Sequence, residues 1–155
     1  MEKTTAFVMV GAPGSGKSTH AAKLAQTENA VIVSGDDIIA DLYGDAAIQG
    51  NWVEIHDEIE RQVADAVERG KNVILDGTHY KHVYRNEAIT LLRSYGFESV
   101  EAVVLDASLA TCLARNFQRV ERNVPDYVVK QIHSTLQCGL RTIMTETFDR
   151  FHFVY

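Results

Sequence analysis

The sequence predicts an α/β fold in which a five-stranded parallel sheet lies between two layers of helices. Two observations lead to this expectation. Short apolar runs alternate with segments of helical periodicity along the chain, and a glycine-rich loop separates the first apolar run from the first helix. With 155 residues, the chain is long enough to bury one sizeable core. We therefore expect a single domain over residues 1–155.

Hydrophobic spacing defines the individual elements. The apolar runs fit buried strands, and the segments between them repeat apolar residues every three or four positions, as helices do. Strands are expected at residues 6–10, 30–33, 72–75, 99–105 and 151–155. Helices are expected around residues 21–25, 36–42, 52–70, 84–95 and 108–119 and from 125 onward, with a loop at 44–50. Ser108 is the expected N-cap of its helix, and Pro125 is expected in the first turn of the next.

The glycine-rich loop matches the pattern G-x-x-x-x-G-K-[ST] and reads Gly11-Ala12-Pro13-Gly14-Ser15-Gly16-Lys17-Ser18-Thr19. Glycines at these positions let the backbone bend so that successive N–H groups point at a phosphate. Lys17 adds a positive charge for the outer phosphates, and Ser18 adds a hydroxyl ligand for Mg²⁺. The positive end of the following helix points to the same place. The chain is therefore expected to bind a nucleoside triphosphate through this P-loop.

Acidic residues follow two of the predicted strands. Asp36 and Asp37 come shortly after residues 30–33, and Asp76 follows residues 72–75. The carboxyl ends of parallel strands face the ligand crevice, so these carboxylates are expected near the triphosphate. One of Asp36 and Asp37 suits a base that orients an acceptor hydroxyl, although either also suits helix capping. Asp76 suits a magnesium contact, with a strand-ending turn as the alternative.

Three arginines, Arg115, Arg119 and Arg122, are spaced by four and three residues. They share one face of a helix if the helix continues through them. Guanidinium groups are suited to stabilise charge on a transferring phosphoryl group. The alternative is a solvated helix face with surface ion pairs.

Other residues with reactive or binding side chains are expected to be structural. His79 and His82 have no accompanying Cys or His pattern that would complete a metal site. Trp52 keeps helical spacing with apolar residues, so it is expected in the core rather than as a stacking platform. Cys112 and Cys138 are expected to be reduced core thiols.

Composition favours small substrates over long nucleic acids. The net charge is −6 and the sequence pI is near 5.4, whereas binding along a phosphate backbone needs a surface of lysines and arginines. Contact with a nucleic-acid terminus alone remains compatible with this charge. No apolar run is long enough to span a membrane and no signal peptide precedes the first strand, so a cytoplasmic protein is expected. The oligomeric state stays open.

Taken together, these motifs resemble the polynucleotide 5′-kinase-like family of P-loop kinases, over nearly the whole chain. Residues 11–19 match the family's G-x-P-G-S-G-K-S-T, and residues 34–39 align with its x-R-D-D-x-R element. Residues 76–79 are similar to its D-x-T-N strand end, and residues 112–125 to its L-x-x-R-N-x-x-R lid with a following V-P. The resemblance implies a three-layer α/β/α P-loop kinase fold with a helical lid near residues 108–125.

The resemblance also implies an activity and roles for single residues. It implies an ATP- and Mg²⁺-dependent phosphotransferase in which Asp36 is the general base. Lys17 and Ser18 serve the phosphates and the metal, and Arg119 is the lid arginine with Arg115 beside it. The implied acceptor is a nucleic-acid 5′-hydroxyl. The alternatives are a small-molecule P-loop kinase acting on a small alcohol, and a nucleotide-binding regulator or ATPase without an alcohol acceptor.

Departures from the family pattern concentrate on the acceptor side. Gly35 and Ile39 stand where the family has arginines, and His79 stands where it has asparagine. The second family arginine contacts a phosphate of the nucleic-acid acceptor. Its replacement by Ile39 leaves the acceptor open.

Overall fold

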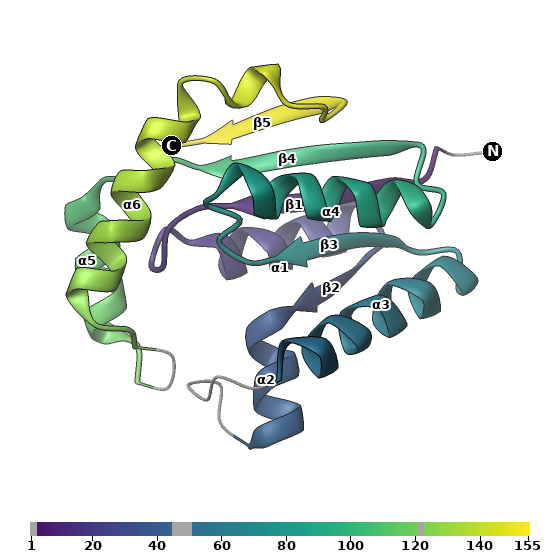
Figure 1. The fold of residues 1–155 in the computed structure, drawn as a ribbon, viewed down its shortest axis with the longest axis horizontal. Coiled ribbons are helices and arrows are strands. Elements are labelled where there is room, and N and C mark those ends of the chain that lie inside the picture. Colours follow the sequence, from purple (N-terminus) through teal and green to yellow (C-terminus); the bar gives the residue numbers. More distant parts are fainter. Residues whose placement is uncertain (1–2, 45–50, 121–122) are drawn as a thin grey trace.

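The computed structural model describes residues 3–44, 51–120 and 123–155, and it has three layers, α/β/α (Figure 1). The expected fold class is confirmed. All neighbouring strands of the five-stranded sheet are parallel, in the order β2-β3-β1-β4-β5. The strands are β1 (Thr5–Val10), β2 (Ala30–Ser34), β3 (Asn72–Asp76), β4 (Ser99–Leu105) and β5 (Arg150–Val154).

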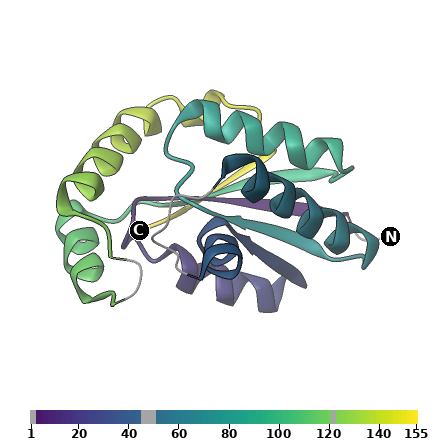
Figure 2. The ribbon, with the colours of Figure 1, turned by 60° about the horizontal axis from the view of Figure 1, so that its bottom comes forward.

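The helices are divided between the two faces of the sheet and its carboxyl edge. Figures 1 and 2 show α3 and α4 on one face and α1 on the other, with α5 and α6 beyond the carboxyl ends of the strands. Their bounds are α1 Lys17–Thr27, α2 Gly35–Tyr43, α3 Trp52–Glu68, α4 His82–Ser94, α5 Leu109–Gln118 and α6 Asp126–Leu140, followed by the 3₁₀ turn η1 Ile143–Thr145. None of the helices in the described ranges is long and apolar enough to cross a membrane.

The central strand β1 has a buried residue at almost every position because both of its faces are covered. Phe7 and Met9 pack in one cluster with Ala21 of α1, whereas Val8 packs in the other with Leu92 of α4. Successive side chains of a strand point to opposite faces, which explains the continuous apolar run in the sequence. Burying side chains of this size contributes about 1.5–3 kcal/mol each. The two cores hold the carboxyl ends of the strands in register.

Helix α5 ends at Gln118, one residue before Arg119, which was predicted to share a helical face with Arg115. Arg119 is its C-cap residue and is extended, with φ −77° and ψ 127°. The buried Asn116 side chain explains the end of the helix, because its amide donates to Val124 O at 2.7 Å and accepts from Val124 N at 3.2 Å. These bonds turn the chain back toward α6. The prediction that Arg115 and Arg119 continue one helical face is therefore wrong, and Arg122 lies outside the described residues.

Several smaller expectations are resolved by the structure. Ser108 caps α5 as predicted, accepting from Thr111 N at 3.1 Å, whereas Pro125 is the N-cap of α6 rather than a first-turn residue. Trp52 was expected in the core but is 64% exposed, and it is the first residue of α3. Cys112 is buried as expected, but Cys138 is exposed on α6. Most of the loop expected at 44–50 lies outside the described residues.

Candidate active site

The P-loop joins β1 to α1 and needs glycine at two positions. Gly14 and Gly16 have φ values of 80° and 97°, in the left-handed region that favours glycine. A Cβ on Gly14 would lie only 2.3 Å from the carbonyl oxygen of Cys112 in α5. The loop therefore approaches α5 more closely than any side chain allows. Gly11, Ala12 and Ser15 of the loop are buried.

A cavity of about 470 Å³ lies above the loop at the carboxyl edge of the sheet. It brings together Lys17, Ser18, Asp36, Asp76, Arg115 and Arg119, which lie up to about 100 positions apart in the sequence. Its described lining residues are Pro13, Gly14, Gly16, Lys17, Ser18, Thr19, Ser34, Gly35, Asp36, Asp76, Gly77, Thr78, Arg115, Arg119, Val124, Val128 and Ile132. The glycine cradle and the positive groups around it fit a polyphosphate.

Lys17 lies at the first position of α1 with its ammonium group inside the loop. Its Nζ donates to Ala12 O at 3.1 Å. Burial is the largest influence on its pKa and lowers it, and the charge of Arg119 acts in the same direction. The carboxylates of Asp76 and Asp36 oppose this shift but do not overcome it. An entering phosphate would stabilise the charged form of Lys17.

Ser18 and Asp76 form the oxygen-rich part of the cavity. The Ser18 hydroxyl donates to Asp76 Oδ2 at 3.0 Å, and Asp76 is the last residue of β3. A hydroxyl and a carboxylate are suitable ligands for Mg²⁺, which usually takes the rest of its ligands from phosphates and water. No group of three or more His, Cys, Asp or Glu side chains suited to hold a metal occurs within the described ranges.

The two aspartates at the start of α2 differ in position. Asp36 is among the residues that line the cavity, whereas Asp37 is not. The backbone N–H of Asp37 donates to the Ser34 side chain at 3.3 Å, as part of the N-cap of α2. The sequence left these two residues open as alternatives on chemical grounds, and the cavity favours Asp36.

Arg115 of α5 and Arg119, the residue that follows this helix, lie on the P-loop side of the cavity. Arg115 and Arg119 line the cavity, and a Cβ on Gly16 would lie 3.2 Å from the Arg115 guanidinium. Val128 and Ile132 of α6 line the same cavity, so one side of it is apolar. The residues between α5 and α6 are described at 119–120 and from 123 onward.

A second cavity of about 510 Å³ adjoins the first and was not predicted from the sequence. Gly35, Asp36, Asp76, Gly77 and Thr78 line both cavities, so Asp36 lies where they meet. The other walls come from α2, α3 and α4. The spacing of Trp52 and the other apolar residues of α3 predicted core packing, and no sequence pattern indicated a cavity beside them.

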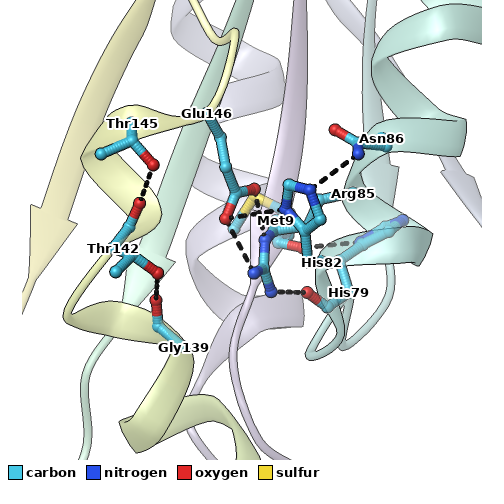
Figure 3. A network of polar contacts seen from close by, with 9 residues as sticks. All are labelled: Met9, His79, His82, Arg85, Asn86, Gly139, Thr142, Thr145 and Glu146. Atoms are coloured by element: carbon cyan, nitrogen blue, oxygen red, sulfur yellow. Dashed lines mark hydrogen bonds and ion pairs between the residues drawn. The ribbon is translucent and has the colours of Figure 1, made fainter.

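Behind the P-loop, a polar network joins β1, the β3–α4 loop, α4 and the turn after η1 (Figure 3). Nδ1 of His79 lies 2.7 Å from Met9 O, and His79 has a φ of 42°. Burial is the main cause that lowers the pKa of this imidazole, so a neutral ring that donates to Met9 O fits the contact. Arg85 donates to His79 O at 2.9 Å and forms a two-bond ion pair with Glu146, at 2.7 and 2.9 Å.

One feature of the sequence, a charged residue among the apolar positions of α4, indicates this network. Arg85 lies on the apolar face of α4 with Ala88, Ile89 and Leu92, where a charged residue is unusual. Its side chain and that of Glu146 are each only 2% exposed. A buried arginine needs a charged partner, and here the partner is 61 residues away in the chain.

A family model described as "AAA domain" matches residues 7–138 of this chain. Among curated proteins, no sequence matches it. A chain of the Pnkp1/Rnl/Hen1 RNA repair complex is similar in structure, with a TM-score of 0.79 and 23% identity over 92% of this chain. The present chain spans about half the length of that relative, 47%.

Two further solved structures share the fold. A sugar kinase from Janibacter sp. HTCC2649 has a TM-score of 0.62 and 21% identity, with 99% of this chain and 85% of that one covered. The AvrRxo1-ORF1:-ORF2 complex with ATP has a TM-score of 0.72 and 18% identity, with 92% and 50% covered. At these identities the likeness concerns the fold. The chain belongs to the AAA domain family and has a P-loop kinase-like fold.

Proposed function

We propose that the protein is an ATP- and Mg²⁺-dependent phosphotransferase that transfers the γ-phosphoryl group to an alcohol. One observation carries the proposal. Asp36 lines the cavity that contains the P-loop lysine and also lines the adjoining cavity. Nucleotide binding alone does not need a carboxylate at this position, whereas transfer to a hydroxyl does.

On the donor side, the P-loop amides and Lys17 hold the β- and γ-phosphates. Ser18 and Asp76 would hold Mg²⁺. When bound there, Mg²⁺ would supply positive charge against the phosphates. Arg115 and Arg119 stabilise the charge that spreads over the transferring group. They belong to the proposed helical lid near residues 108–125, described at 108–120 and 123–125.

On the acceptor side, Asp36 orients the hydroxyl. The hydroxyl oxygen forms a bond to the γ-phosphorus while the bond between that phosphorus and the β–γ bridging oxygen breaks. The hydroxyl proton passes to Asp36, and ADP is the leaving group. This assignment adopts Asp36 over Asp37 because Asp36 lines both cavities.

The resemblance to polynucleotide 5′-kinases favours a nucleic-acid 5′-hydroxyl as the acceptor of the phosphoryl group. A small alcohol is the alternative acceptor. The structural likeness to a chain of an RNA repair complex supports the fold that both activities would use. A nucleotide-binding regulator is the rival from another class. It would not need a base at Asp36.

The test is phosphoryl transfer by the wild type and by Asp36→Asn, with Asp37→Asn as the matched control. Labelled ATP is offered with single- and double-stranded 5′-hydroxyl oligonucleotides and with a panel of small alcohols. We expect Asp36→Asn to lower kcat about 10²–10⁴-fold with little change in ATP affinity, and Asp37→Asn to retain activity. Unchanged transfer by Asp36→Asn contradicts its role as base. ATP hydrolysis without any phosphorylated acceptor supports the regulator.

A further inference from the structure

The cavity that adjoins the P-loop cavity has mostly apolar walls, and Asp36 lies where the two cavities meet. Most of its apolar side chains come from three helices, with Val33 of β2 and Leu75 of β3 beside them, so they form a pocket rather than a single stripe. They include Ile39 of α2, Trp52, Ile55 and Ile59 of α3, and Tyr84 and Leu91 of α4. Asp36 lies at the junction with the P-loop cavity. A molecule in this pocket therefore has a route to the proposed base.

Two aromatic rings of this pocket have large exposed surfaces. Trp52 is 64% exposed and Tyr84 is 40% exposed, although both are large hydrophobic side chains. Aromatic faces of this kind stack well on flat rings of a ligand, which removes apolar surface from water at low entropic cost. The pocket thus has a preference for a flat ring.

Trp52 is held in place by bonds between the end of α2 and the start of α3. The Tyr43 hydroxyl donates to Glu54 at 2.5 Å and accepts from Asn51 N at 2.9 Å. The Asn51 side chain in turn caps α3 by accepting from Val53 N at 2.9 Å. The Trp52 backbone is therefore fixed relative to α2, which carries Asp36. Such preorganisation favours binding because little order is lost.

The charges around the pocket disfavour an anionic ligand. Asp36, Asp76 and Glu87 line it, and its described lining residues include no lysine or arginine. Two of the residues that line it are histidines, and burial lowers the pKa of His79, which favours its neutral form. Among the lining residues a phosphate would meet three carboxylates and no lysine or arginine; Lys81, whose Nζ lies 5.6 Å from the Tyr84 ring centroid, does not line the pocket.

The polynucleotide 5′-kinase-like family has arginines at two positions of this pocket where the present chain has none. Gly35 and Ile39 both line it. A Cβ at Gly35 would meet no atom within 4 Å, so the pocket has room for a longer side chain but carries no charge there. Ile39 instead packs against the core and adds apolar surface.

We infer that the acceptor is a small, uncharged alcohol with a flat ring, which lies against Trp52 while its hydroxyl reaches Asp36. The transfer step rests on the proposed phosphotransferase function, but the binding preference does not. An acceptor with a phosphate close to its ring, such as a nucleic-acid end, is disfavoured.

Binding can be measured without catalysis, because Trp52 is the single tryptophan of the chain. Thymidine, pyridoxine and benzyl alcohol are titrated against the protein in the presence of ADP, and the tryptophan emission is followed. The matched anionic probe is thymidine 3′-monophosphate, which differs from thymidine by one phosphate. We expect thymidine to bind about tenfold more tightly than its 3′-phosphate.

Variants locate the site by calorimetry. Trp52→Ala is expected to weaken thymidine binding about tenfold, whereas Val53→Ala, a neighbouring residue that is 65% exposed and does not line the pocket, leaves it unchanged. Gly35→Arg is expected to reverse the preference toward thymidine 3′-monophosphate. Ile39→Arg is a second version of that test, since Ile39 also packs against the core.

The outcomes separate the inference from the proposed function. Equal or tighter binding of thymidine 3′-monophosphate by the wild type overturns the inference, as does the absence of binding by all three uncharged probes at about 10 mM. Phosphorylation of oligonucleotides alone would retain the phosphotransferase and reject the inferred acceptor. Binding of uncharged probes without phosphorylation of any acceptor would retain the pocket and reject the phosphotransferase.

Discussion

The Ser18 hydroxyl donates a 3.0 Å hydrogen bond to Asp76 Oδ2, joining the first turn of α1 to the last residue of β3. The two residues are 58 positions apart, and both line the P-loop cavity. The bond aligns two oxygen groups at the position where a nucleotide-bound Mg²⁺ would need them. Ser18 would exchange this bond for a metal contact on binding Mg²⁺.

Asp76→Asn is therefore predicted to impair the use of Mg²⁺ more than the binding of nucleotide. We expect the Mg²⁺ concentration for half-maximal activity to rise about 10–100-fold, since an amide oxygen is a weaker ligand than a carboxylate. The measurement is a Mg²⁺ titration of the transfer rate at saturating ATP. Asp106→Asn is the matched control, because Asp106 directly follows β4 but does not line the P-loop cavity. An equal effect of both variants would contradict the metal role of Asp76.

Lys17→Met is predicted to separate binding from stability. The pKa of Lys17 is lowered, mainly by burial, so its charged form is unfavourable in the ligand-free fold. The unfolded chain therefore binds more protons between the folded and the unfolded pKa of Lys17, and the free energy of unfolding rises with pH in that window. Lys17→Met removes this rise and stabilises the ligand-free protein at neutral pH. Its affinity for ATP should fall at least about 100-fold.

Urea denaturation from neutral pH up to the ordinary lysine pKa, with ATP titrations alongside, checks both parts of this prediction. Lys23→Met is the control, since Lys23 is an exposed lysine on the same helix. It should leave ATP affinity and the pH slope unchanged. A loss of stability in Lys17→Met at neutral pH would show that the lysine stabilises the empty loop.

Gly14→Ala is predicted to disturb the P-loop through a steric clash as well as backbone strain. Its Cβ would lie 2.3 Å from Cys112 O, at a φ of 80°. Gly70→Ala is the matched control, because Gly70 has a φ of 68° but nothing within 4 Å of its Cβ. We expect Gly70→Ala to cost about 1 kcal/mol and Gly14→Ala about 1–3 kcal/mol more, measured by urea denaturation. Equal costs would mean that α5 shifts freely away from the loop.

Local patterns were sufficient to predict the strands, the P-loop and the cap of α5. Each of these depends on residues close in the chain: the apolar run of β1, the spacing of Gly11 to Ser18, and Ser108 with Thr111. Because both faces of the sheet are buried, its inner strands are continuous apolar runs that are easily recognised in the sequence. This part of the site could therefore be placed from sequence before the structure was known.

Contacts between distant or irregular segments explain what could not be predicted. The extended conformation of Arg119 depends on Asn116 bonding to Val124, and an amide side chain in a helix does not reveal such a bond. Helical spacing placed Trp52 on the core side of α3, but its side chain is 64% exposed, whereas that of Ile55 is 4% exposed. The apolar face of α4 indicates that Arg85 is buried, but its partner Glu146 could not be predicted because it lies 61 residues away in the chain.

The ion pair of Arg85 and Glu146 yields the last prediction. Each side chain is 2% exposed, and Arg85 also donates to His79 O behind the P-loop. Glu146→Leu leaves a buried guanidinium without its charged partner, so we expect a loss of about 3–5 kcal/mol in the free energy of unfolding. The double variant Arg85→Met with Glu146→Leu should recover most of this loss, since apolar side chains of similar volume often replace a buried pair at little cost.

Urea denaturation of the two single variants and the double variant measures this coupling. Arg93→Met is the control on the same helix: Arg93 pairs with Asp149 at 3.1 Å, but their side chains are 38% and 39% exposed, so its loss should cost at most about 1 kcal/mol. A double variant as unstable as Glu146→Leu would mean that the pair is needed for more than its mutual charge. The bond from Arg85 to His79 O is then the candidate, and reduced ATP affinity of the double variant would identify it, because His79 contacts the end of β1 next to the P-loop.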